Sequence, residues 1–355
     1  MKKIITTVAV LMFLLALSAP LTFAQATSAQ PAAQDPAADE AAAYKAWYDA
    51  YTAKDNAKRV ELGKAFIAKF PNSKNATYVK TDVATARGLL LNAAVQAKNV
   101  PEIIRLTKEA MADDPDNPDY QYFLINQLRT LDTNFQYATD LGQAAGTGIQ
   151  MLEAGKTFKL YKDAKKNETL AYYHDTLASI DEHNKDTDKA LAHTEQAAML
   201  DPMNARYFFN CGRLHQLRYK TASDEYLKLP EADRQAAEPK PEVKAALDKA
   251  NAEADNVINC WARFMGLPKN DYPADVKQRV QGALTELYKY RNNGSDAGLA
   301  QLIEANKTSP TPVKMTPPAE PKPPTAEQKP ADQSAAKPGN SQPAAAKPAT
   351  KKPKM

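Results

Sequence analysis

The sequence predicts an all-α protein, and three observations support that fold class. Only 12 of the 355 residues are glycine, which is low against the ordinary usage of about 7% and unlike most proteins built from strands and turns. Alanine, leucine, lysine, glutamate and glutamine dominate the middle of the chain, and these residues lose little side-chain entropy in a helix. Between proline clusters, apolar residues recur every three or four positions, which is the period of an amphipathic helix.

The first 26 residues have the layout of a secretion signal. The stretch "MKK" is a positive n-region, "IITTVAVLMFLLAL" is an apolar run, and "AQA" at 24–26 offers the small residues that a signal peptidase reads. We expect cleavage after Ala26, with Ala24 as the second choice. An uncleaved membrane anchor is the competing interpretation, but Ser18 and Pro20 interrupt the apolar run. The signal predicts export to the periplasm or cell envelope, or secretion.

Composition divides the remaining chain into three parts. Residues 27–39 are rich in Ala, Gln, Pro and Ser and predict a flexible leader, residues 40–307 predict the helical domain, and residues 308–355 predict a disordered Pro/Ala/Lys-rich tail. The last fifty residues, 306–355, hold nine lysines against three acids, so the body itself is mildly acidic. A folded nucleic-acid-binding face is therefore not expected. The tail is either a solubilising spacer, which we favour, or a contact to anionic envelope polymers.

Prolines with neighbouring Asn and Asp residues mark the ends of the expected helices. Proline cannot continue a helix and biases the preceding residue away from helical dihedral angles. The expected stops are "KFPNSKN" at 69–75, "DDPDNPD" at 113–119, "LDPMN" at 200–204, "KLPEAD" at 228–233 and "EPKPE" at 238–242.

The helical segments repeat. When "NVPEIIRLTKEAMADDPDNPDYQYFLI" is aligned with "DTDKALAHTEQAAMLDPMNARYFFNCG", Ala110 falls on Ala197 and Pro115 on Pro202 without a gap. The earlier segment "NAKRVELGKAFIAKFPNSKNATYV" has the same shape, with Pro71 as its stop. Such self-similarity is typical of repeat proteins, in which each unit stacks on its neighbours.

At these residues the chain resembles the tetratricopeptide repeat (TPR) family, most clearly over 172–202. Leu177-Ala178 occupy the large-small pair of the family's first helix, Ala190 and Ala197 its small positions on the second helix, and Pro202 its terminal proline. The small residues allow helices to approach closely. The resemblance implies a right-handed α-solenoid of four or five TPR-like helical hairpins, of a degenerate exported bacterial type similar to cell-envelope TPR proteins.

The match is uneven along the chain. Cys211-Gly212 hold the large-small pair of the next repeat, whereas Thr194 stands where the family prefers an aromatic residue and Asp181 where it prefers tyrosine. The resemblance covers residues 42–225 well and 226–305 weakly, so a plain helical bundle is the alternative for the last hundred residues.

The TPR resemblance implies a groove lined by the first helix of each hairpin. Arginine together with aromatic residues on a concave face is the usual composition of a protein-binding hot spot. Tyr122 and Phe209 are equally compatible with the core, and Gly88 and Asn92 do not reproduce the family's clamp for a terminal carboxylate. The expected partner-binding residues are Tyr122, Asn126, Arg129, Asp175, Ser179, Glu182, Arg206, Phe209, Arg213 and Gln216.

The two cysteines, Cys211 and Cys260, lie on expected helices in an oxidising compartment, and they predict either two buried thiols, which we slightly favour, or a disulfide. The four histidines show no metal-binding spacing, and "DDPDNPD" lacks the glycine and distal glutamate of a calcium loop. No nucleophile motif or phosphate loop is present, so neither an enzyme nor a cofactor is expected.

The leading hypothesis is a non-enzymatic module that binds a peptide or protein partner. A structural or assembly component of a cell-envelope complex is the alternative, and a ligand-binding or catalytic site hidden in 226–305 is the weakest hypothesis. The sequence leaves the oligomeric state open.

Overall fold

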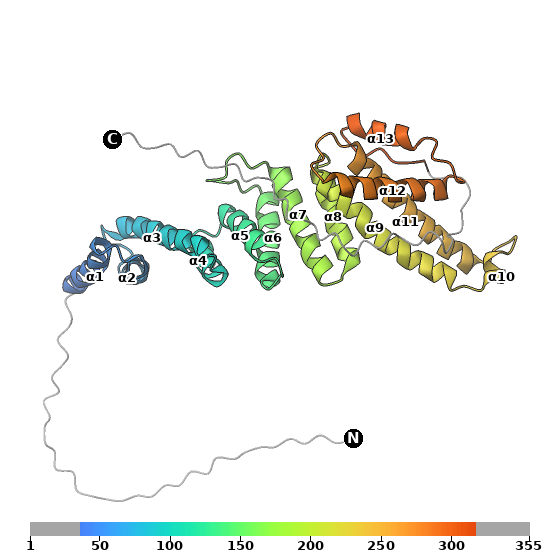
Figure 1. Ribbon diagram of the computed structural model, residues 1–355. Coiled ribbons are helices and arrows are strands. Elements are labelled where there is room, and N and C mark those ends of the chain that lie inside the picture. The colour runs from blue at the N-terminus through green and yellow to red at the C-terminus, as the bar shows by residue number, and fades with distance from the viewer. Residues whose placement is uncertain (1–35, 317–355) are drawn as a thin grey trace, which may run out of the picture. The chain divides into compact units, whose positions relative to one another are not determined.

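A computed structural model describes residues 36–316, and within this range all regular secondary structure is helical, which confirms the predicted all-α class (Figure 1). The signal (1–26), most of the leader and the tail beyond Thr316 lie outside the described residues. The helices are α1 Pro36–Thr52, α2 Asn56–Lys69, α3 Ala76–Gln96, α4 Val100–Asp113, α5 Asp119–Leu131, α6 Ala138–Glu153, α7 Lys166–His183, α8 Thr187–Leu200, α9 Ala205–Leu227, α10 Glu231–Arg234, α11 Pro241–Gly266, α12 Ala274–Arg291 and α13 Leu299–Thr308.

The described residues form two compact units, 36–80 and 81–316, divided within α3. In the first unit, α1 packs on α2. Trp47 and Phe66 are fully buried there, and the Trp47 ring meets Tyr78 edge-on with 5.5 Å between ring centroids. None of the helices formed by residues 36–316 combines the length and apolar character needed to cross a membrane.

The same turn joins three of the helix pairs. Before α2, α4 and α8, a lysine (Lys54, Lys98 and Lys185) adopts positive φ angles of 57, 53 and 63°. The next residue, Asp55, Asn99 or Asp186, then caps the following helix by accepting a backbone N–H three residues on. Asp and Asn side chains suit this role because they satisfy amides at a helix start that have no partner within the helix.

The ends of α2, α4 and α8 also share one geometry. Their C-cap residues Phe70, Asp114 and Asp201 have φ of −128, −141 and −134°, and each donates its N–H to the carbonyl four residues earlier. Those carbonyls belong to the residues aligned in the sequence repeat, Ala110 and Ala197 among them. The repeat found in the sequence is therefore a repeat of backbone conformation.

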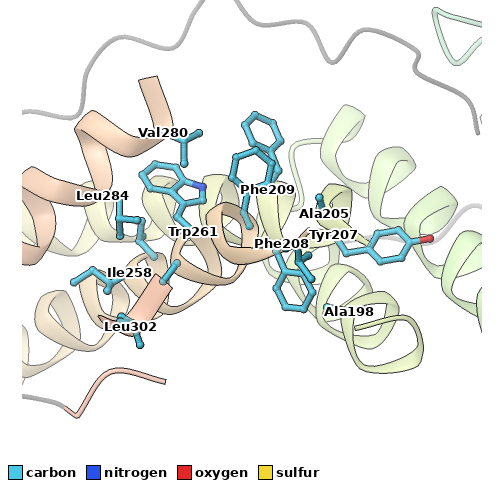
Figure 2. Packing of buried hydrophobic residues seen from close by; sticks show 14 of the residues in the cluster. Ala198, Ala205, Tyr207, Phe208, Phe209, Ile258, Trp261, Val280, Leu284 and Leu302 are labelled. Carbon is cyan, nitrogen blue, oxygen red and sulfur yellow. The ribbon is translucent and has the colours of Figure 1, made fainter. Parts of the chain in front are cut away.

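In the second unit, contacts run mainly between successive helices from α4 to α9 and then from α9 to α11. One core, including Ile103, Leu124 and Leu141, spans α3 to α7. A second core spans α7 to α13 and includes Phe208 and Trp261 (Figure 2). Each helix thus buries its apolar face mostly against its neighbours in sequence.

Glycines permit close contacts between helices. A Cβ atom added to Gly212 on α9 would lie 2.2 Å from the indole of Trp261 on α11, and one added to Gly148 on α6 would lie 2.5 Å from the ring of Tyr173 on α7. Ala190 and Ala197 are completely buried. The small residues singled out in the sequence therefore serve close packing.

The packed chain extends beyond the predicted boundary at residue 307. Arg263 is fully buried and donates to the carbonyl oxygens of Asn306 at 2.7 Å and Ser309 at 2.8 Å. The Asn306 side chain brackets Val313, accepting its N–H and donating to its carbonyl oxygen, both at 2.9 Å. Met315 is 7% exposed. The proline-rich composition of the segment after residue 307 did not indicate this packing, because Arg263 and Asn306 supply its hydrogen bonds.

Candidate binding surface around Asp175

Asp175 is the centre of a charged cluster that joins three helices. It lies on α7 with its side chain 3% exposed, 2.9 Å from Nη1 of Arg129 on α5 and 3.1 Å from Nε of Arg206 on α9. Arg129 also donates to Thr176 Oγ1 at 2.8 Å. Three residues that the TPR resemblance placed on one face are thus joined, because both arginines contact Asp175.

The cluster carries one more positive than negative charge. Burial raises the pKa of Asp175, but the two guanidinium groups outweigh that effect and hold the pKa below its ordinary value. Arg206 engages Asp175 through Nε and its side chain is 25% exposed, so its terminal amino groups offer donors to an outside anion.

Tyrosines from α5, α7 and the loop between α6 and α7 lie beside the cluster. The guanidinium of Arg129 lies 4.8 Å from the centroid of the Tyr172 ring, which places it in cation–π range. Tyr122, half-buried, contacts Tyr161 and Phe158 with centroid distances of 4.7 and 5.6 Å. Burial raises the pKa of Tyr172 to about 12, so its hydroxyl stays protonated at neutral pH.

The loop that carries Tyr161 is fastened to the start of α5. The backbone amides of residues 159, 160 and 161 donate to the Asp119 carboxylate at 3.0, 3.0 and 3.3 Å. Asp119 belongs to the "DDPDNPD" turn and is 1% exposed. Sequence reasoning missed Tyr161 and Tyr172. The acidic turn offers hydrogen-bond acceptors, but the sequence does not show that the loop at 159–161 donates to Asp119.

A second ion pair lies seven residues further along both helices. Arg213 on α9 donates to Glu182 on α7 through both terminal amino groups, and the two side chains are 20% and 43% exposed. The pairs Asp175–Arg206 and Glu182–Arg213 thus repeat along the α7–α9 contact, because seven residues return to the same helix face.

Phe209 is not part of this surface, and its assignment to the groove is wrong. It is 7% exposed and packs against Phe264 and Tyr272 with centroid distances of 5.5 and 4.9 Å. The later helices cover it, and α9 alone gave no sign of them. Ser179 donates to the carbonyl oxygen of Asp175, and Asn126 and Gln216 are half-buried on α5 and α9.

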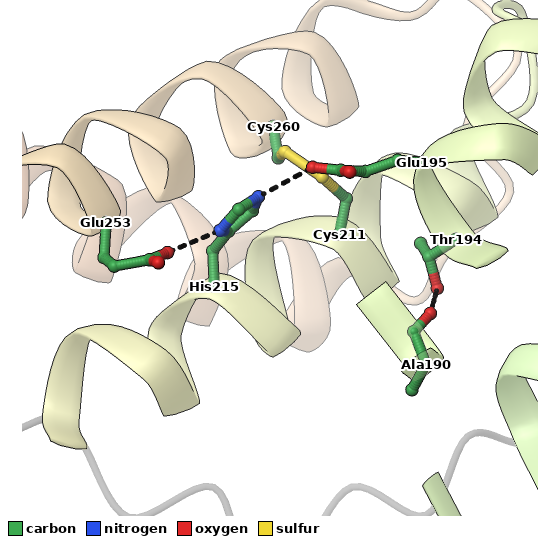
Figure 3. The surroundings of a disulfide bond; sticks show 7 residues. All are labelled: Ala190, Thr194, Glu195, Cys211, His215, Glu253 and Cys260. Carbon is green, nitrogen blue, oxygen red and sulfur yellow. Dashed lines mark hydrogen bonds and ion pairs between the residues drawn. A yellow bond between two sulfur atoms is a disulfide. The ribbon is translucent and has the colours of Figure 1, made fainter. Parts of the chain in front are cut away.

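Cys211 and Cys260 form a disulfide between α9 and α11 (Figure 3), which is the option the sequence favoured less. Their Cα atoms are 5.9 Å apart, within the range for a bridge. A surface depression of about 600 Å³ lies elsewhere and has no aromatic lining; its residues are Asn184, Lys185, Asp186, Thr187, Asp188, Leu217, Arg218, Thr221 and Lys249.

No protein-family model matches this chain, and no curated protein is detectably similar to it. The resemblance to TPR proteins therefore rests on the residues and turns described above.

Proposed function

We propose that the protein is a non-enzymatic interaction module that holds an extended peptide, or an extended segment of a protein, on the face shared by α5, α7 and α9. The TPR-like hairpins stack as a right-handed solenoid, and this face lines its groove. The lysine–Asx turns before α2, α4 and α8 support the solenoid, since a shared turn gives these three helix pairs similar geometry.

The Asp175 cluster carries the proposal. Two arginines share one buried carboxylate, so the fold holds the Arg206 guanidinium in place while its side chain stays 25% exposed. Partly buried tyrosines lie beside it. Preorganised arginine beside tyrosine is the usual composition of a binding hot spot, and it favours a partner segment that carries a carboxylate.

The charge of the Asp175 cluster also argues against a catalytic role for the same residues. Asp175 is buried and ionised between two cations, so it is poorly placed to exchange protons near neutral pH. The amino-terminal signal expected from the sequence favours binding in the periplasm or envelope, with the Lys-rich tail as a solubilising spacer.

The test compares Arg206→Gln with Arg279→Gln in the full-length chain. Both variants lose one positive charge, but Arg279 lies on α12 and pairs with Asp275 on its own helix. Peptides are selected from a random library on the wild type, and their affinities are measured by fluorescence polarisation. We expect carboxylate-containing peptides whose affinity falls about tenfold or more in Arg206→Gln and is unchanged in Arg279→Gln. Equal affinities for both variants would contradict the proposal.

Cell fractionation separates this function from the assembly role. Free periplasmic behaviour supports the peptide-binding module. Stable co-sedimentation with outer membranes that is unaffected by Arg206→Gln would instead support a permanent structural component of an envelope complex.

A further inference from the structure

A second group of polar side chains surrounds the disulfide, away from the Asp175 cluster. The Cys211 and Cys260 sulfur atoms and a ring nitrogen of His215 all lie within 4.8 Å of one another. Cys211 and His215 are four residues apart on α9 and so share one helix face, while α11 supplies Cys260 (Figure 3). Two thiols and one imidazole at this separation are a common zinc ligand set.

The orientation of His215 suits metal binding. Its Nδ1 lies 2.7 Å from Oε2 of Glu253, which is itself buried at 6% exposure. Arg218 holds the other Glu253 oxygen at 2.9 Å. Metal-binding histidines commonly hydrogen-bond a carboxylate through one ring nitrogen, which fixes the ring and directs the other nitrogen at the ion.

The second ring nitrogen of His215 points toward a fourth ligand. Nε2 lies 3.4 Å from Oε1 of Glu195 on α8. For zinc bonded to nitrogen and oxygen at about 2.0–2.2 Å in a tetrahedron, those two ligand atoms are separated by about 3.3–3.5 Å. The imidazole and the Glu195 carboxylate already have the spacing of two zinc ligands.

We propose that the protein binds one Zn²⁺ through Cys211, Cys260, His215 and Glu195 when its disulfide is reduced. A dithiol reductant supplies two electrons and two protons, becoming a disulfide itself and leaving two thiols. Zinc then displaces both thiol protons, together with the Nε2 proton when the His215 ring is doubly protonated. The sulfur atoms separate from bonding distance to about 3.8 Å, the spacing of two thiolates on tetrahedral zinc.

Reduction followed by zinc binding replaces one link between α9 and α11 with another. In the oxidised protein the link is covalent, and in the reduced protein it is a metal ion bound by the same two sulfur atoms. Cys211 and His215 are about 95% buried, and the side chain of Glu195 is 51% exposed. Glu195 therefore provides the access route for the ion.

The experiment uses Co²⁺ as a spectroscopic substitute for Zn²⁺ on the untagged full-length chain. The disulfide is reduced with a phosphine, which takes up oxygen from water to become a phosphine oxide as the two thiols form. We expect one equivalent of Co²⁺ to produce a thiolate-to-metal charge-transfer band and the visible bands of tetrahedral Co²⁺, and Zn²⁺ to abolish both. The oxidised protein should show neither band.

Variants test the ligands and the Glu253 carboxylate that orients His215. Cys211→Ser/Cys260→Ser supplies the baseline without a thiolate band, and His215→Ala should reduce metal affinity strongly. Glu253→Gln leaves all four ligands intact and should weaken Zn²⁺ binding by about 10- to 100-fold. The matched control is Glu225→Gln, which removes an exposed glutamate paired with Lys249 and should leave affinity unchanged.

Two outcomes would overturn the proposal. One is a reduced wild-type protein whose charge-transfer band is no stronger than that of the double-serine variant, whatever its helix content by circular dichroism. The other is a thiolate band whose metal affinity is the same in His215→Ala as in the wild type, because the imidazole would then be no ligand.

Discussion

Gly212 makes the closest helix contact described above, and replacing it with alanine tests the packing directly. A Cβ atom at this position would lie 2.2 Å from Cδ1 and Nε1 of Trp261, whereas ordinary van der Waals contact begins near 3.4 Å. Trp261 is 1% exposed and surrounded by the second core, so its indole would have to move by more than 1 Å within packed surroundings. Overpacking of this severity costs about 3 kcal/mol.

The helix itself prefers alanine, so the two effects oppose each other. Alanine in place of a helical glycine gains about 1 kcal/mol, which leaves Gly212→Ala about 2 kcal/mol less stable than the wild type. Gly282→Ala on α12 is the matched control, because a Cβ there meets nothing within 4 Å, and it should stabilise the protein by up to about 1 kcal/mol. Urea denaturation followed by circular dichroism measures both. A Gly212→Ala variant as stable as Gly282→Ala would refute the packing described here.

Three further predictions concern charge and the disulfide. Asp175→Asn removes the buried carboxylate shared by two arginines and should destabilise the protein by about 3 kcal/mol. Because the folded-state pKa of Asp175 is lowered, the wild type should lose this stabilisation as the pH falls below about 4. Denaturation curves of the variant should lack that acid-dependent loss. Burial lowers the pKa of His215, but its hydrogen bonds to two glutamates outweigh this effect and raise the pKa. The contribution of His215 to the free energy of unfolding should therefore be complete below about pH 6.5 and disappear at higher pH. A His215→Gln variant whose free energy of unfolding declines over the same pH range would contradict this. Cys211 and Cys260 are 49 residues apart in sequence, so reduction in the presence of a chelator should lower the free energy of unfolding by about 4 kcal/mol, with no effect of reductant on Cys211→Ser/Cys260→Ser.

Local sequence signals predicted the helices and their repeat well. Proline stops and Asp or Asn caps act within a few residues, so Pro115 and Pro202 indicated where helices end without knowledge of the fold. The alignment of Ala110 with Ala197 corresponds to matching C-cap geometry. The TPR resemblance also placed Arg129, Asp175 and Arg206 on one face, and both arginines contact Asp175 in the structure.

Features that depend on distant parts of the chain were harder to predict. Phe209 looked like a groove residue because α9 alone does not reveal the rings of Phe264 and Tyr272 that cover it. The loop at 158–161 joins the tyrosine cluster only through its hydrogen bonds to Asp119. Likewise, the Cys211-His215 spacing gained chemical meaning only when α8 and α11 brought carboxylates and a second thiol to it.

Photo-crosslinking in intact cells tests the proposed binding face most directly. A photoreactive amino acid replaces Asn126, which lies on α5 between Tyr122 and Arg129 on the same helix face, and in a second strain it replaces Met199 on α8, which is 64% exposed. A discrete crosslinked protein is expected from position 126, absent from position 199 and lost when Arg206→Gln is added. Crosslinking only from position 199, or a product from position 126 that persists with Arg206→Gln, would contradict binding at the α5–α7–α9 face.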